Sequence, residues 1–296
     1  RHDARQPRNG AAVIVRRDRG VALLIVLWGC TLLAIMLGGF AALARTEGLQ
    51  ARYQFAQTRA HYAAEAGVMR AIEGLQTPDA ASRWVADGRP YVFAFDDANV
   101  NITIVDEDGK VDLNAASGDV LTGLFKAAGA TDDKAGSLSA AIQDWRRPGD
   151  AASPNGAKKP QYEAAGLAYG PRNGPFATVE EARMVLGMDA RLWTTVAPVL
   201  TIWSGRERPN TEHAQPLALA SIPGLGSAGA DAILASRGQS NGAAVAGGNG
   251  VTHTIRAEAI LDDGTRSSLT STIRLRGIRS GNQPYAILRW REGDVE

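Results

Sequence analysis

The clearest pattern in the chain is an uninterrupted apolar run close to its first residues. Residues 21–44, VALLIVLWGCTLLAIMLGGFAALA, contain no charged side chain. As an α-helix they would extend about 36 Å, enough to cross a hydrocarbon core of about 30 Å. A buried helix of that length in a water-soluble protein would normally carry a polar face. The pattern therefore predicts a membrane span.

A helical pattern continues beyond the apolar run as far as Gln76. Small and apolar residues recur at steps of three and four, the spacing of one helix face, at Leu49, Tyr53, Ala56, Ala60, Ala64, Val68, Ile72 and Leu75. Thr77 and Pro78 end the pattern. We therefore expect one helix of about 55 residues, half in lipid and half packed through this apolar stripe.

Patterns typical of β-strands come before and after a second helical region. Residues enriched in β-branched and aromatic side chains lie at 91–95, 100–105, 252–261, 265–275 and 285–290. Turn-forming segments at 96–99 and 262–264 separate consecutive strands. These strands predict one antiparallel sheet that is interrupted in the sequence.

The interrupting residues, 112–240, carry the signals of several short helices. Ser117 can cap one helix, Thr131 precedes a second, and residues 178–181 form a capping box before a third. Five prolines within 146–175 predict a long irregular loop. The order of long helix, strands, helical insert and strands predicts an α+β fold, with the long helix packed on the sheet.

Charge divides the chain more sharply than its overall composition does. The chain has 32 Lys+Arg and 31 Asp+Glu, a net charge of +1, which is not the balance of a strongly basic nucleic-acid binder. Residues 1–20, however, hold six Arg and only two Asp. We therefore expect five parts: a basic leader at 1–20, the transmembrane part of the first helix at 21–44, its outer half with the first strands at 45–111, an inserted α-domain at 112–240, and C-terminal strands at 241–296.

The residue types give little support to catalytic or metal chemistry. The single cysteine, Cys30 inside the apolar run, excludes a disulfide framework and a cysteine-based zinc site. His61, His213 and His253 have no nucleophile or metal-ligand signature around them. The sequence therefore predicts that the protein is not an enzyme, and a membrane-anchored periplasmic enzyme is the least favoured class.

The junction between the basic leader and the apolar run has a specific form. Gly20 follows an arginine cluster and directly precedes Val21. This arrangement resembles the recognition site of type IV prepilin peptidases, which cut after a glycine and leave the apolar helix on the mature protein. The alternative is an uncut signal anchor. The arginine cluster favours a cytoplasmic N-terminus, so we expect a single-pass inner-membrane protein whose C-terminal domain is periplasmic.

Further short motifs follow this junction in a fixed order along the chain. They are Asp106–Asn114, Asp144-Trp145, Arg172–Phe176, Glu180-Glu181, Ala197-Pro198, Asn210–Leu219 and Ile222–Gly224. Together with Arg19-Gly20, they make the chain similar to the general secretion pathway protein K family, the large minor pseudopilins of type II secretion systems. The resemblance implies a pilin-like fold with a large inserted α-domain of SAM-like or helix-hairpin type. It also implies a place at the tip of the pseudopilus, where the protein helps to start assembly and the export of folded proteins across the outer membrane.

The resemblance also implies partners. These are the I and J type minor pseudopilins, the major pseudopilin, the prepilin peptidase and the inner-membrane assembly platform; contact with secreted cargo is left open. Most pilin-like proteins have a Glu at the fifth mature position, where this chain has Ile25, as in the tip-associated K type. We expect partners to pack on the helix face formed by Ile25, Tyr53, Ala56, Ala60, Ala64 and Val68.

In the resembled family an acidic loop after the Asp-Trp pair often binds Ca²⁺. Here the pair is followed by arginines, and Lys158 and Lys159 stand where the family tends to have acidic residues. Ca²⁺ requires several oxygen ligands, many of them charged. We therefore expect no metal or other cofactor, and a surface ion pair in which Lys158 or Lys159 faces Asp144 or Asp150.

A second function class remains open at this stage. Residues 222–226 resemble the turn of a helix-hairpin-helix, and residues 266–291 hold six Arg and no acidic residue. These features would suit a membrane-anchored DNA-binding protein of the competence or type IV pilus kind. Ser227, Ala228 and Gly229 stand where Lys or Arg would help to hold a phosphate, so no nucleic-acid partner is expected.

Overall fold

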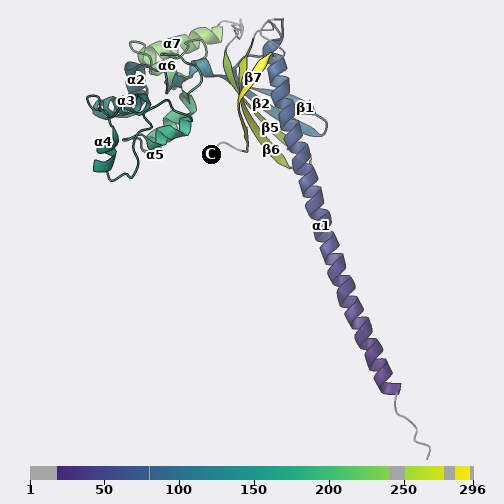
Figure 1. The fold of residues 1–296 in the computed structure, drawn as a ribbon. Helices are drawn as coiled ribbons and strands as arrows, with labels where there is room; N and C mark the ends of the chain where they lie inside the picture. The colour runs from purple at the N-terminus through teal and green to yellow at the C-terminus, as the bar shows by residue number, and fades with distance from the viewer. Residues whose placement is uncertain (1–18, 80, 240–250, 277–283, 294–296) are drawn as a thin grey trace, which may run out of the picture. The chain divides into compact units, whose positions relative to one another are not determined.

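The computed structural model describes residues 19–79, 81–239, 251–276 and 284–293 (Figure 1). The chain divides into two compact units, residues 1–56 and 57–296. The first helix, α1 (Arg19–Gln76, 58 residues), makes up the described part of the first unit and continues into the second. Residues 1–18 of the expected leader lie outside the described part of the chain.

In the first unit, α1 exposes its apolar side chains on all sides. Residues 21–55 are exposed throughout, including Trp28 at 65% and Phe40 at 73%. Within the described residues, α1 is the one helix long and apolar enough to cross a membrane. This exposure is what a lipid-facing helix requires, because hydrocarbon rather than protein would cover these side chains.

The second unit contains a five-stranded antiparallel sheet in the order β1-β2-β5-β6-β7. Its strands are β1 (Asp87–Phe95), β2 (Ala98–Asp106), β5 (Thr252–Leu261), β6 (Arg266–Leu275) and β7 (Tyr285–Glu292). β2 and β5 are neighbours in the sheet, with Asp106 opposite His253. The residues between these two strands therefore leave and re-enter the sheet at one end.

One face of the sheet packs against the C-terminal part of α1 (Figure 1). The alternate residues Val100, Ile102 and Ile104 of β2 are fully buried, whereas Asn99 and Asn101, on the opposite face of the strand, are exposed. A Cβ atom added at Gly67 of α1 would lie 2.6 Å from Val100 Cγ1. The helix backbone thus approaches the sheet too closely for any side chain at this position.

The residues between β2 and β5 form a separate helical core. Its elements are η1 (Glu107–Gly109), β3 (Val111–Asp112), α2 (Gly118–Ala127), α3 (Asp132–Arg146), α4 (Lys159–Ala164), η2 (Val179–Met184), α5 (Ala190–Val196), η3 (Ala197–Val199), β4 (Leu200–Thr201), α6 (Pro216–Ala220) and α7 (Gly226–Gln239). Leu121, Phe125, Ile142 and Tyr162 are fully buried in it. The short parallel pair of β3 and β4 joins the beginning of this segment to its later part. We refer to these residues as the α-domain.

Two local features differ from the sequence prediction. The expected irregular stretch at 146–175 contains the helix α4. The expected capping box at 178–181 instead begins the 3₁₀-helix η2, and the side chain of Thr178 makes no capping hydrogen bond. The Glu181 carboxylate pairs with Arg172 and accepts a hydrogen bond from the amide of Ala177, one residue before the cap expected at Thr178, while Glu180 contacts β7. The α+β class itself is confirmed.

Candidate functional site

The expected processing site lies at the start of α1. The backbones of Gly20 and Val21 belong to the first turn of the helix, and the side chain of Val21 is 63% exposed. Cleavage between these residues stays a prediction. Ile25, one turn further on, is 66% exposed and presents no carboxylate along the span.

The helix face expected to bind partners is only partly available. Ala60, Ala64 and Val68 are fully buried within this chain, next to the close approach of Gly67 to β2 and β5. For these three residues the prediction is wrong, because the protein's own sheet covers the stripe. The periodicity of apolar residues shows that one helix face is buried, but it does not show whether the same chain or another subunit buries it.

The other residues of that face remain accessible. Tyr53 is 63% exposed and Ala56 is half-buried. Exposed apolar side chains on α1 therefore extend from the apolar run to Tyr53, with Leu49 at 66% between them. Beyond Tyr53, α1 also exposes Phe55 at 66% and Tyr62 at 60%, so a surface for neighbouring helices on α1 can include these residues as well.

The loop after α3 is organised around a buried lysine. The ammonium of Lys158 donates hydrogen bonds to the carbonyl oxygens of Asp144 at 2.7 Å and Arg147 at 2.6 Å, and to Oδ1 of Asn173 at 2.7 Å. The residue is 1% exposed, and burial lowers the pKa of its ammonium. Three oxygen acceptors satisfy the three donors of the ammonium, which makes this burial tolerable.

This arrangement corrects the surface ion pair expected for Lys158 or Lys159. The carboxylate of Asp144 accepts hydrogen bonds from the amide and hydroxyl of Ser153, both at 2.9 Å, and pairs with Arg147 at 2.7 Å. Lys158 instead reaches the backbone oxygen of Asp144, and Lys159 is exposed beside Glu163. The charge of Lys158 predicted a position on the surface, but the carbonyl oxygens of Asp144 and Arg147 form a buried site for its ammonium.

Ionisable side chains gather where the α-domain joins the sheet. His253 of β5 is 2% exposed, and neither of its ring nitrogens has a hydrogen-bond partner within the described ranges. Burial, with help from the nearby His213, lowers the pKa of His253 to about 4. His213 lies 3.5 Å from Asp106, and burial raises the pKa of that carboxyl to about 6. Low dielectric surroundings disfavour the charged form of both groups.

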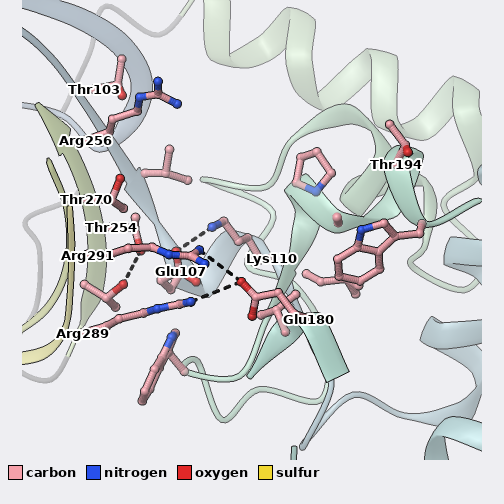
Figure 2. A pocket seen from close by; sticks show the side chains of 18 residues that line it. Thr103, Glu107, Lys110, Glu180, Thr194, Thr254, Arg256, Thr270, Arg289 and Arg291 are labelled. Atoms are coloured by element: carbon pink, nitrogen blue, oxygen red, sulfur yellow. Dashed lines mark hydrogen bonds and ion pairs between the residues drawn. The ribbon is translucent and has the colours of Figure 1, made fainter. Parts of the chain in front are cut away.

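A cleft of about 580 Å³ lies between the α-domain and the sheet face opposite α1 (Figure 2). The sheet contributes threonines and arginines from β2, β5, β6 and β7. The α-domain contributes Glu180, Trp193, Pro198 and Trp203. Arg289 and Arg291 point across the cleft toward Glu180 (Figure 2). This site was not predicted; its signal in the sequence was the acid-free run of arginines at 266–291.

The segment that resembled a DNA-binding hairpin is part of the α-domain core. Ile222 and Leu225 pack against the core cluster, and a Cβ added at Gly123 of α2 would lie 2.4 Å from the carbonyl oxygen of Ser221. Arg237 of α7 donates to the carbonyl oxygen of Ala214 at 2.8 Å. The hairpin therefore packs in the core of the α-domain. In the basic run at 266–291, Arg289 and Arg291 contact Glu180.

Comparison with known proteins agrees with this architecture. Residues 98–205, which begin at β2 and end in the α-domain, match the family described as "Type II secretion system (T2SS), protein K". "Type II secretion system protein K" of Klebsiella pneumoniae is 31% identical over 208 residues, which is 62% of this chain and 62% of that protein. These residues are therefore similar to protein K of type II secretion systems.

A solved structure extends the likeness to the overall fold. A chain in the crystal structure of the GspK-GspI-GspJ complex from the type 2 secretion system of enterotoxigenic Escherichia coli superposes with a TM-score of 0.57. The match covers 85% of this chain and all of that chain at 16% identity. The pilin-like fold expected from the sequence is thereby confirmed. The aligned region spans less than two thirds of the Klebsiella protein K.

Proposed function

We propose that the protein is a minor pseudopilin at the tip of a type II secretion pseudopilus, where it helps to start assembly and the export of folded proteins. The observation that carries this proposal is the match of residues 98–205 to protein K. The exposed apolar part of α1 supports a membrane-anchored subunit. The proposal places the N-terminus in the cytoplasm, the span in the inner membrane and the second unit in the periplasm, in keeping with the positive-inside bias.

The proposed partners are the I and J type minor pseudopilins. The similar solved chain comes from a complex named GspK-GspI-GspJ. Ile25 supports a position above the other subunits, because a residue without a carboxylate cannot pair with the terminal amine of a neighbour. The major pseudopilin, the prepilin peptidase and the inner-membrane platform would act with this protein during assembly.

Photo-crosslinking from α1 tests the tip position. A crosslinkable residue at Tyr53, which is exposed on the apolar face, should capture the I and J type subunits in intact cells. Ala51 is the matched control, because two residues along a helix turn the side chain by about 200°. Strong capture from Tyr53 with weak capture from Ala51 supports the proposal. Ladders of this protein crosslinked to itself would contradict it.

Processing provides a second test of the same role. We infer that a prepilin peptidase cuts between Gly20 and Val21, because glycine presents the least bulk beside the bond to be broken. Mass analysis of the membrane-extracted protein should find Val21 as the first residue. A mature chain that starts elsewhere would remove the support that the leader gives to the pseudopilin proposal.

We also propose that the protein acts by assembly rather than by catalysis and holds no calcium in the α-domain. The oxygens that converge after α3 accept hydrogen bonds from the ammonium of Lys158, and the Asp144 carboxylate is paired with Arg147. A calcium ion bound to the same oxygens would lie close to the buried ammonium, and the two positive charges would repel each other. The residues present therefore do not fit a calcium ion.

A further inference from the structure

The cleft between the sheet and the α-domain has an unusual floor. A sheet face covered by another domain is ordinarily apolar, as the α1 face of this sheet is. The cleft face instead carries hydroxyl groups and guanidinium groups, at Thr103, Thr254, Thr270, Thr272, Arg256, Arg289 and Arg291. The hydroxyls of Thr254 and Thr272 lie 3.0 Å apart. Such a surface is suited to polar ligands and not to a dry contact with the α-domain.

The α-domain side of the cleft carries two tryptophans and a proline beside its charged residues Glu107, Lys110 and Glu180. Trp193 and Trp203 are both half-buried, and Pro198 is exposed beside them. Tryptophan and arginine side chains are enriched at sites where proteins bind polypeptides. The cleft therefore combines one wall for apolar side chains with a floor of hydrogen-bond donors and acceptors.

Positive charge exceeds negative charge where β7 meets the α-domain. Arg289 and Arg291 both contact the same oxygen, Oε1 of Glu180, at 3.2 and 3.4 Å. The second oxygen, Oε2, is buried and has no hydrogen-bond partner among the residues that the structure describes. Charge-assisted hydrogen bonds are ordinarily about 2.7–2.9 Å long, and an arginine fork uses both carboxylate oxygens. Glu180 is therefore a poorly matched partner for two guanidinium groups.

The dimensions of the cleft suit an extended chain. Its floor includes residues of four neighbouring strands, β2, β5, β6 and β7. Three spacings of about 4.8 Å between strands give a floor of roughly 14 Å. An extended peptide advances about 3.3 Å per residue, so roughly four residues would cross this floor. The volume is also within the usual range for a ligand site.

We propose that this cleft binds a short, extended, acidic segment of another polypeptide, whose carboxylate displaces Glu180 from Arg289 and Arg291 and whose apolar side chain lies against the tryptophan wall. Glu180 acts in the free protein as an internal substitute for that carboxylate. The occupant is a polypeptide because the cleft offers both a charged end and an extended apolar wall. The inference goes beyond the assembly role and does not rest on it.

Peptide binding to the full-length protein in detergent micelles tests this inference. The probe is a dye-labelled tetrapeptide of alternating acidic and leucine residues, with its neutral Asn/Gln counterpart as the matched ligand, and binding is followed by fluorescence anisotropy. Glu180→Gln removes the internal competitor, so the acidic peptide should bind about tenfold tighter than to the wild type. A misfolded variant cannot produce this gain.

Two further variants complete the test. Replacing Arg289 and Arg291 together with Gln should weaken binding of the acidic peptide at least about tenfold. Arg266→Gln, an exposed change on β6 outside this cleft, should leave the affinity unchanged. The proposal is overturned if Glu180→Gln shows no gain in affinity, or if the neutral peptide binds as well as the acidic one.

Discussion

Replacing Lys158 with Met should destabilise the second unit strongly. Methionine keeps most of the apolar stem but removes the ammonium, so the carbonyl oxygens of Asp144 and Arg147 and Oδ1 of Asn173 lose their donor. An acceptor left without a partner costs about 1–3 kcal/mol, with the part-buried acceptors at Arg147 and Asn173 near the lower end of that range. The ammonium no longer has to be desolvated, which offsets part of this loss. We expect a net fall in the free energy of unfolding of about 3 kcal/mol.

The adjacent Lys159→Met is the matched control. Lys159 is 74% exposed and lies 3.7 Å from Glu163, one helical turn away. Exposed pairs of this kind contribute only about 0.3–0.5 kcal/mol. The same substitution one residue along the chain should therefore leave stability nearly unchanged.

Thermal unfolding of the full-length protein in micelles can measure the difference. Trp145 is 3% exposed and stacks on Phe176 with ring centres 5.8 Å apart, so its fluorescence reports on this loop. For a unit of this size, about 3 kcal/mol corresponds to a fall in Tm of roughly 6–12 °C. If Lys158→Met and Lys159→Met melt within about 1 °C of each other, the buried ammonium does not stabilise the loop and the reasoning is wrong.

Three other outcomes are expected. Calcium at millimolar concentration should leave the Tm of the wild type unchanged, and an increase of several degrees would show that the α-domain holds the ion after all. Gly67→Val should lower the free energy of unfolding of the second unit in urea by about 2 kcal/mol or more, because a Cβ at this position would lie 2.6 Å from Val100 Cγ1. Gly48→Val, on the exposed part of α1, is the control and should have little effect. Acidification from pH 6.5 toward 4 should reduce the free energy of unfolding by about 3 kcal/mol through His253. The pKa of His253 is lowered to about 4 in the folded state, so the unfolded chain binds a proton at a higher pH than the folded protein does and is stabilised relative to it. Asp106, whose pKa is raised to about 6, makes the folded state more stable as the pH falls and so acts in the opposite direction. The contribution of His253 is therefore measured as the difference in acid sensitivity between the wild type and His253→Leu. Equal loss of stability in the two proteins would contradict the prediction.

Elements with local signals could be predicted from the sequence. α1 follows from an apolar run and a repeat of three and four residues, both contained in the helix itself. Ser117 and Thr131 cap α2 and α3 by accepting hydrogen bonds from amides three residues away. β1 and β2 follow from β-rich residues around a short turn. In each of these cases the residues that decide the structure are close in sequence.

Elements that depend on distant partners could not be predicted. Residues 178–181 have the composition of a capping box, but the carboxylate of Glu181 pairs with Arg172, Glu180 pairs with Arg289, and η2 forms instead. The burial of Lys158 depends on where the carbonyl oxygens of Asp144 and Arg147 point, which no side-chain pattern records. The apolar stripe of α1 shows the same limit, since a sheet and a neighbouring subunit would leave the same periodicity.

Because the α-domain is inserted between neighbouring strands, the sheet can be completed only after the whole insert has been made. β2 is synthesised long before its partner β5, with Asp106 and His253 about 150 residues apart. Until β5 arrives, β2 presents an unpaired edge that can pair with another chain. The α-domain, in which α2 packs on α3 and α6 packs on α7, can fold first and bring the two ends of the insert together, which lowers the entropy cost of the final pairing. The rate at which the helical insert folds would then set how long that edge stays open to aggregation.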